Sequence, residues 1–222
     1  MRSSPRFAGR KTMTRGQEGK KAGGQAIILL SGGLDSLVSL GVVKEKYNVT
    51  LALTFDYGQK SAKQEIEAAA KISRYYGIEH RIIELDWLKD ITNPNEIWVP
   101  NRNGLFLNIA ASFADSEGYD YIIFGANKEE AQDFPDNTTE FVEKINAAFE
   151  FSTLKKPKVI APLIDYDKNA IVKLAIENAF PLELVQSCYN PQDKHCGECE
   201  SCIRLKNALE YNIADDYIKK LF

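Results

Sequence analysis

Short apolar runs alternate with amphipathic segments along most of this chain. Runs rich in Ile, Val, Leu and Phe, which are typical of strands buried on both faces, occupy residues 26–30, 50–55, 80–85, 121–124 and 158–160. Apolar residues at helical spacing predict helices over residues 34–46, 61–76, 103–117, 138–149 and 167–178. This alternation predicts an α/β fold in which helices cover both faces of a doubly wound, Rossmann-like parallel sheet.

The segments that directly follow the predicted strands are the first places to look for a functional site. Doubly wound sheets bind their ligands beyond the carboxyl ends of the strands. Those segments are residues 31–36, 56–59, 125–127 and 162–168.

Residues 31–36 join an apolar strand to a helix through a glycine pair. Gly32 and Gly33 lack side chains, so backbone N–H groups can close on an anion at the positive end of the helix dipole. Ser31 and Ser36 add hydroxyl donors. A Walker A loop requires a lysine after its second glycine, whereas here Asp35 lies inside the motif, which excludes a G-protein or ATPase of that type. The alternative is an ordinary strand-to-helix turn that happens to contain glycine.

Composition and charge narrow the class of protein. The chain has 222 residues with 44% hydrophobic and 27% charged positions, as in a globular domain, and no run approaches the ~20 apolar residues of a membrane span. Residues 1–21 carry seven Lys or Arg and one Glu, whereas the remainder carries 21 basic and 30 acidic residues. We therefore expect no membrane insertion and no stable binding of nucleic acid.

The first 24 residues are basic and almost free of large apolar side chains. They predict a disordered basic tail, because they cannot bury enough surface to become ordered. A targeting segment, or an extension upstream of a true start at Met13, would have the same composition. No secretory apolar core is present among them, so we expect a cytoplasmic protein.

All four cysteines fall within fifteen residues, at Cys188, Cys196, Cys199 and Cys202. In a chain without secretory features this clustering indicates a metal site rather than disulfides. Four thiolates suit a closed, structural zinc site, although the last three spacings also fit an iron–sulfur cluster, and free buried thiols are a third interpretation. His195 is then a residue beside the ligands or on the surface. The predicted organisation is an α/β domain over residues 25–186 and a helical, zinc-binding segment over residues 187–222.

The pattern S-G-G-x-D-S at residues 31–36 resembles the pyrophosphate-loop signature of the ATP pyrophosphatases. Members of that superfamily have an adenine nucleotide alpha hydrolase-like fold and release pyrophosphate while leaving AMP on a substrate oxygen. Together with this loop, several further segments resemble the 7-cyano-7-deazaguanine synthase family in their order and spacing. They are residues 55–59, 99–103, 134–136, 162–163 with Lys168, and 187–189 leading into the cysteines.

This resemblance implies an enzyme that converts 7-carboxy-7-deazaguanine, ATP and ammonia into a nitrile used in queuosine or archaeosine formation. It also implies a homodimer that uses Mg²⁺ and Zn²⁺. The implied catalytic residues are Ser31, Asp35, Ser36, Arg102 and Lys168. The implied ATP-binding residues are Leu30, Ser31, Gly32, Gly33, Leu34, Asp35, Ser36, Leu37, Val38, Ser39, Leu40, Asp56, Gln59 and Gly125.

On the phosphate side, Asp35 is a candidate indirect ligand of Mg²⁺. Lys168 is a candidate cation for departing pyrophosphate, and its alternative is a solvated lysine at a helix start.

On the substrate side, Asp136 can accept two hydrogen bonds from the edge of a guanine-like base, or it can cap the helix that begins near Thr138. Arg102 can pair with the substrate carboxylate or a phosphate. Asn103 can contact the substrate or cap its helix. Tyr57 and Phe134 can stack on bases or belong to the core.

The chain departs from the family pattern in three places. Asn101 stands where many members have glycine, Asn137 stands where many have cysteine, and the loop over residues 126–132 lacks the expected threonine and glycine. These departures concern the substrate pocket more than the ATP site. Three alternatives follow: a tRNA-thiolating pyrophosphatase, an enzyme that passes the activated carboxyl to an amine other than ammonia, and a catalytically silent zinc- and nucleotide-binding module.

Overall fold

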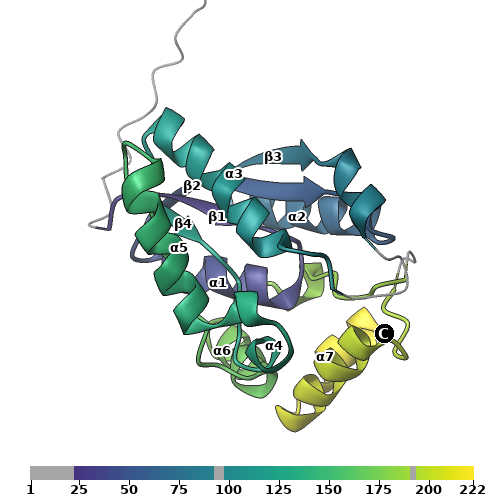
Figure 1. Cartoon of the computed structure of the whole chain (residues 1–222). Helices are drawn as coiled ribbons and strands as arrows, with labels where there is room; N and C mark the ends of the chain where they lie inside the picture. Colours follow the sequence, from purple (N-terminus) through teal and green to yellow (C-terminus); the bar gives the residue numbers. More distant parts are fainter. Residues whose placement is uncertain (1–22, 93–97, 191–193) are drawn as a thin grey trace, which may run out of the picture.

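The computed structural model describes residues 23–92, 98–190 and 194–222 (Figure 1). The tail prediction for residues 1–22 therefore lies outside the described residues. Gly23 and Gly24 belong to the same predicted tail, but their backbones form hydrogen bonds with the chain between the first helix and the second strand. The Gly23 N–H donates to the Lys46 carbonyl at 3.1 Å, and the Gly24 carbonyl accepts from the Asn48 N–H at 2.9 Å.

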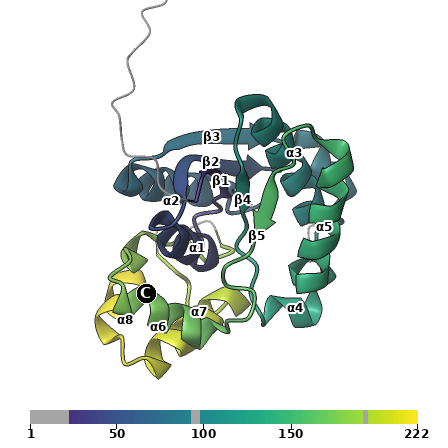
Figure 2. The ribbon, with the colours of Figure 1, turned by 90° about the vertical axis from the view of Figure 1, so that its left-hand side faces the viewer.

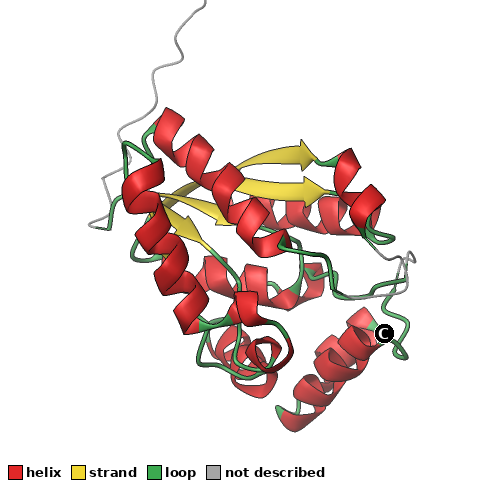
Figure 3. Ribbon diagram, in the orientation of Figure 1, coloured by secondary structure: helices red, strands yellow, loops and turns green. Residues whose placement is uncertain are grey.

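The core of the fold is a five-stranded, fully parallel sheet of order β3-β2-β1-β4-β5 (Figures 1 and 3). Its strands are β1 (Gln25–Leu29), β2 (Asn48–Asp56), β3 (Glu79–Glu84), β4 (Tyr121–Ile123) and β5 (Lys158–Ile160). The chain moves outward from β1 to β3 and then returns to the other side of β1 with β4. The boundary between β1 and β4 is thus the topological switch point, where a doubly wound sheet opens a crevice for ligands.

Helices cover both faces of the sheet, as the sequence predicts (Figure 2). One face packs on α1 (Leu34–Lys44), α2 (Ala62–Tyr76), α6 (Lys168–Glu177), η3 (Leu182–Leu184), α7 (Glu200–Tyr211) and α8 (Asp215–Leu221). The other face packs on η1 (Asp86–Ile91), α3 (Arg102–Glu117) and α5 (Thr139–Ser152). The short elements α4 (Glu130–Asp133) and η2 (Pro135–Asn137) lie between β4 and α5.

The C-terminal segment is part of the same core. Leu205 and Leu209 of α7 and Leu221 of α8 are buried in one apolar cluster with Leu37 of α1 and Ile171 of α6. Burial of such side chains stabilises by about 1.5–3 kcal/mol each, so this contact holds the cysteine-bearing segment on the α/β body. Among the residues described here, no helix is long and apolar enough to cross a membrane.

The predicted helices and strands are confirmed, with shifts of a few residues at their ends. The helix expected to open at Asn103 begins at Arg102, and its N-cap is Asn101, with φ of 53°. Glycine and asparagine are the residues that adopt this left-handed conformation at least cost. Asparagine can therefore replace glycine at position 101, because both residues adopt this backbone conformation. The replacement does not shift the start of α3.

Candidate active site

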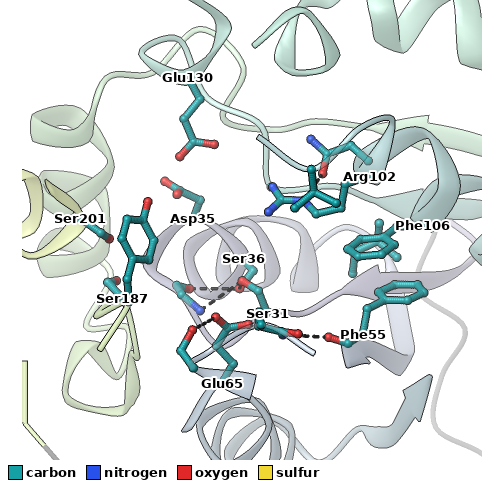
Figure 4. Close-up of a pocket in the computed structure, with 18 of the residues that line it drawn as sticks. Ser31, Asp35, Ser36, Phe55, Glu65, Arg102, Phe106, Glu130, Ser187 and Ser201 are labelled. Carbon is teal, nitrogen blue, oxygen red and sulfur yellow. Dashed lines mark hydrogen bonds between the residues drawn. The ribbon is translucent and has the colours of Figure 1, made fainter. Parts of the chain in front are cut away.

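A cavity of about 990 Å³ borders the carboxyl edge of the sheet (Figure 4). Each of the four segments singled out from the sequence contributes to its lining. They are joined by α2, by the chain before α3, by residues 130–137, and by residues 186–189 with α7 of the C-terminal segment. The cavity is therefore enclosed by both predicted parts of the chain.

The glycine-rich loop after β1 brings the start of α1 to this cavity, and the Gly33 N–H donates to Ser31 Oγ at 3.3 Å. Gly32 has φ of 83°, and a Cβ atom there would lie 2.7 Å from the Glu65 carbonyl oxygen of α2, so glycine is required for the close approach. Gly33 is the N-cap of α1, and no side chain caps the helix. Ser36 Oγ donates to the Gly33 carbonyl at 3.0 Å and lies 3.2 Å from Ser31 Oγ. The first-turn amides of α1 are thus available to an anion, as the loop prediction requires.

Gly125, directly after β4, brings a second loop against the start of α1. A Cβ atom at this position would lie 3.2 Å from the Ser36 backbone nitrogen. The absence of a side chain therefore keeps the entrance to the helix terminus open at the switch point.

The Lys168 side chain is only 13% exposed and is paired, which contradicts its interpretation as a solvated lysine. Its Nζ lies 2.5 Å from Asp35 Oδ2 and 3.3 Å from Glu130 Oε1. Burial lowers the pKa of Lys168, but the two carboxylates outweigh this effect and raise it, so the side chain is a cation. Burial raises the pKa of Asp35 against the opposing effect of Lys168. Asp35 Oδ1 is buried and has no hydrogen-bond partner within the described part of the chain.

Glu130 is a site residue that the sequence analysis missed. It belongs to the loop that departs from the family pattern, and that loop is ordered by Asn127, whose Oδ1 accepts from the Glu129 and Glu130 N–H groups at 3.0 Å each. Glu129 Oε1 in turn accepts from the Lys168 N–H at 2.8 Å. Figure 4 shows the carboxylates of Glu130 and Asp35 pointing toward each other. The unusual loop therefore supplies the second carboxylate at Lys168.

Arg102 occupies the opposite side of the cavity from the C-terminal segment (Figure 4). Its Nη1 donates to the Tyr57 hydroxyl at 3.3 Å, and its Nε donates to Asn103 Oδ1 at 3.4 Å. Burial lowers the pKa of Arg102, but Tyr57 and the nearby carboxylates, including Asp136, outweigh this and raise it. Tyr57 lines the cavity and packs its ring against Phe106, with centroids 5.7 Å apart.

Asp136 does not cap α5. Thr138 is the N-cap, because its Oγ1 accepts from the Phe141 N–H at 3.2 Å. The alternative role for Asp136 is therefore wrong, and its carboxylate lines the cavity at 8% exposure. Asn137 Nδ2 donates to Asp136 Oδ1 at 3.1 Å. Burial raises the pKa of Asp136, and Arg102 opposes the shift.

The four cysteine sulfur atoms lie within 4.8 Å of one another, a spacing that suits ligands of one ion. All four are free thiols. Cys196 Sγ accepts from the Cys199 N–H at 3.2 Å and from the Glu198 N–H at 3.4 Å, and these bonds lower the pKa of Cys196 to about 6. Because metals bind the thiolate form, the donors fit a metal centre, and four sulfur ligands suit zinc or an iron–sulfur cluster.

His195 is not a fifth ligand. It is 6% exposed, its ring Nε2 accepts from the Ser187 N–H at 3.0 Å, and its backbone N–H donates to the Leu221 carbonyl at 3.0 Å. Gln186, which precedes Ser187, donates its backbone N–H to the Gly32 carbonyl at 2.8 Å. The segment that carries Cys188 is thus hydrogen-bonded directly to the glycine-rich loop.

Several residues predicted for the ATP site lie away from the cavity. Leu37, Val38, Ser39 and Leu40 are fully buried in α1, because only its first turn faces the cavity. Asp56 Oδ1 accepts from the Gly58 N–H at 3.1 Å within a turn. The predicted residues that do line the cavity are Leu30, Ser31, Gly33, Leu34, Asp35, Ser36, Tyr57, Gln59, Arg102, Asn103, Gly125, Phe134, Asp136 and Lys168.

Besides Glu130, the cavity contains lining residues without a local sequence signal. Glu65, on the first turn of α2, accepts from Gln59 Nε2 at 2.9 Å and from Ser61 Oγ at 2.5 Å. The C-terminal segment adds Ser187, Tyr189, Glu200, Ser201 and Arg204. The sequence pointed to this segment through the nearby cysteines and through the family resemblance of residues 187–189.

The family model described as queuosine biosynthesis protein QueC matches residues 25–95 and 92–213. This chain belongs to the QueC family. Among its relatives, the 7-cyano-7-deazaguanine synthase of Carboxydothermus hydrogenoformans is 45% identical over 209 residues, which cover 83% of this chain and 97% of that protein. The 7-cyano-7-deazaguanine synthase of Methanosarcina barkeri is 42% identical over 228 residues, covering 89% and 99%. The resemblance seen in the sequence is confirmed.

Two solved structures have a fold similar to that of this QueC family member. The U34-tRNA thiolase NcsA from Methanococcus maripaludis, with its [4Fe-4S] cluster, matches with a TM-score of 0.52 and 21% identity over 91% of this chain and 70% of that chain. A 4-thiouridine synthetase in complex with RNA and ATP matches with a TM-score of 0.50 and 19% identity, over 90% and 53%. At such identities the likeness concerns the fold alone.

Proposed function

We propose that this chain is an ATP-dependent carbon–nitrogen ligase that converts 7-carboxy-7-deazaguanine and ammonia into 7-cyano-7-deazaguanine. The names of its relatives support the reaction. The observation that carries the proposal is the shared cavity, in which a phosphate-binding loop with Lys168 faces Arg102 and Asp136. ATP and a carboxylate-bearing base can thus meet in one enclosed space.

The chemistry requires two activations. A carboxylate resists attack by ammonia, so its oxygen first attacks the α-phosphorus of ATP and pyrophosphate leaves. Ammonia then attacks the carboxyl carbon of the adenylate, AMP leaves, and an amide forms with loss of a proton. The amide oxygen attacks a second ATP, pyrophosphate leaves again, and loss of AMP and protons forms the nitrile. Each product therefore consumes two ATP.

The residues divide this work between the two ends of the cavity. The α1 amides and Lys168 stabilise the β and γ phosphates and the charge that develops on pyrophosphate. Arg102 holds the substrate carboxylate, and Asp136 accepts from the N–H edge of the base. Asp35 and Glu130 would hold Mg²⁺, and the unpartnered Asp35 Oδ1 fits this role. Such an ion would offset the negative charge of the phosphates.

We assign the four cysteines to structural Zn²⁺, since four sulfur ligands leave no open position for water. Within the described residues, no cysteine lines the cavity, and a thiolating enzyme would need a thiol or cluster there. This disfavours the tRNA-thiolase alternative.

Assembly and location are also proposals. We propose a location in the cytoplasm. The family resemblance supports a homodimer, and the acidic balance of residues 22–222 supports a protein that does not bind nucleic acid stably. Sedimentation of the purified protein with and without tRNA tests the homodimer and the lack of stable nucleic-acid binding.

The decisive test is mass spectrometry of the products formed from 7-carboxy-7-deazaguanine, Mg-ATP and ammonium. We expect the nitrile, AMP and pyrophosphate, all lost in Asp35→Ala and Ser36→Ala. Asp216→Asn, an exposed change on α8, is the matched control and retains activity. Formation of AMP without amide or nitrile would show that ammonia is not the acceptor of the activated carboxyl group. Absence of AMP as well as of amide and nitrile would overturn the proposal that the chain is a ligase.

A further inference from the structure

We propose that Trp98 is a substrate-positioning residue, and that Trp98 and Phe134 form an aromatic platform on which the fused-ring heterocycle of the substrate stacks. The identity of that heterocycle rests on the proposed function. The platform itself rests on the geometry of the two rings.

Trp98 and Phe134 form a nearly parallel pair inside the cavity. Their ring centroids lie 5.7 Å apart with an interplanar angle of 8°, and both side chains line the cavity wall. This separation is typical of a direct aromatic contact. A ligand ring would therefore extend the stack rather than enter between its members.

The pair is not part of the hydrophobic core. Phe55 and Phe106 are also stacked, with centroids 3.9 Å apart, and they too line the cavity, but they belong to the apolar cluster that covers one face of the sheet. Trp98 and Phe134 are partly exposed and belong to neither apolar cluster. An aromatic stack that faces a cavity instead of the core has surface left for a planar ligand.

A polar group that can read the edge of such a ligand lies beside the stack. Asp136 follows Phe134 by two residues on the 3-10 turn η2, and its buried carboxylate lines the same cavity. The stack fixes the plane of a heterocycle, while Asp136 accepts from its N–H edge. Together they favour a fused-ring base with an N–H edge over a single-ring carboxylate such as benzoate.

The chain offers a direct probe of this contact, because Trp98 and Trp87 are its two tryptophans. Trp87 lies on η1, is 50% exposed and is absent from the cavity lining. Trp87→Phe therefore leaves Trp98 as the sole tryptophan emitter, whereas Trp98→Phe leaves Trp87 as the matched control. Each variant is titrated with 7-carboxy-7-deazaguanine in the absence of ATP, so that binding is observed without turnover.

We expect a saturable loss of emission in Trp87→Phe and none in Trp98→Phe beyond absorption by the ligand. Unchanged Trp98 emission with a compound that the wild-type enzyme converts to the nitrile would overturn the platform and leave the proposed function intact. Quenching without any conversion by the wild type would support the platform and overturn the proposed function. Neither quenching nor conversion would overturn both.

Steady-state kinetics give a second measure. Removing one base–aromatic stack weakens binding about 5- to 150-fold, so Trp98→Ala is expected to raise the KM for the heterocycle by that factor and to leave the KM for ATP within about twofold. Trp98→Phe recovers most of the loss, because it restores an aromatic face. A residue with a packing role alone would lower Tm and change both KM values together, and that outcome would contradict the proposal.

Discussion

The phosphate end of the cavity is formed mainly by the backbone of one contiguous loop, whereas the base end is formed by side chains from separate segments. At the phosphate end, two glycines allow the close turn into α1, and the first turn of this helix has no side-chain cap and lines the cavity within residues 31–36. At the base end, Arg102 comes from the start of α3, while Phe134 and Asp136 come from the chain between α4 and α5.

This difference predicts different responses to substitution. A backbone cradle tolerates changes of its side chains but depends on the charges and contacts that hold it in place. A site of side chains depends on each functional group separately and can change specificity one residue at a time.

The largest expected effect tests the charge at the phosphate end. Lys168→Met removes the cation that is paired with Asp35 and Glu130, and we expect kcat to fall about 10²–10³-fold, as when an electrostatic stabiliser of the transition state is lost. Lys173→Met, on the exposed side of the same helix, is the control. Rates of pyrophosphate release measure the effect, and a fall below tenfold would contradict the role assigned to Lys168.

The second prediction tests what holds the phosphate end in place. Cys202→Ser removes one buried thiol of the four-cysteine cluster that we assign to zinc, and the segment carrying Cys188 of this cluster is linked to Gly32 through the Gln186 hydrogen bond. We expect the free energy of unfolding to fall by about 3 kcal/mol or more and ATP binding to weaken. Calorimetry and ATP titration measure both. A chelator followed by zinc should remove and restore ATP binding in the wild type, and full ATP affinity in the metal-free protein would rule out this coupling.

The third prediction concerns the base end alone. Asp136→Asn keeps the shape but loses an acceptor for the substrate's N–H edge, so we expect the KM for 7-carboxy-7-deazaguanine to rise about tenfold while the KM for ATP is unchanged. An equal rise in both KM values would show that the two ends are not separable.

Asp136→Asn also has a pH signature. Burial raises the pKa of Asp136 in the folded state, so its ionisation costs folding free energy. The native residue is therefore most favourable below the ordinary carboxyl pKa, and stability is lost as pH rises through the raised value. We expect Asp136→Asn to raise Tm at neutral pH and to lose this advantage in acid. Thermal unfolding at several pH values checks it.

The smallest effect is expected at Asn101, where α3 begins. Asn101→Gly keeps a residue that tolerates φ of 53°, so Tm and the KM for substrate should change little. Asn101→Val, as the contrasting variant, should destabilise by about 1–2 kcal/mol because a branched side chain is strained in this conformation. Equal stability of the two variants would refute the backbone explanation of this departure.

The sequence by itself determined the strand and helix order, the position of the glycine-rich loop and the cluster of four cysteines. Each of these has a local physical signature: apolar periodicity for buried elements, a glycine pair at a strand-to-helix turn, and thiols at close spacing. Lys168 was also identified, because its position after the last strand places it at the carboxyl edge of the sheet.

Only the tertiary structure decided which side chains meet in the cavity. Glu130 reaches Lys168 because Asn127 folds the loop after β4, and Trp98 meets Phe134 across 36 positions of sequence. It also separated the first turn of α1 from Leu37, Val38 and Leu40, which face the core. Such pairings depend on how the ends of different strands and helices converge, and no short window of sequence contains that information.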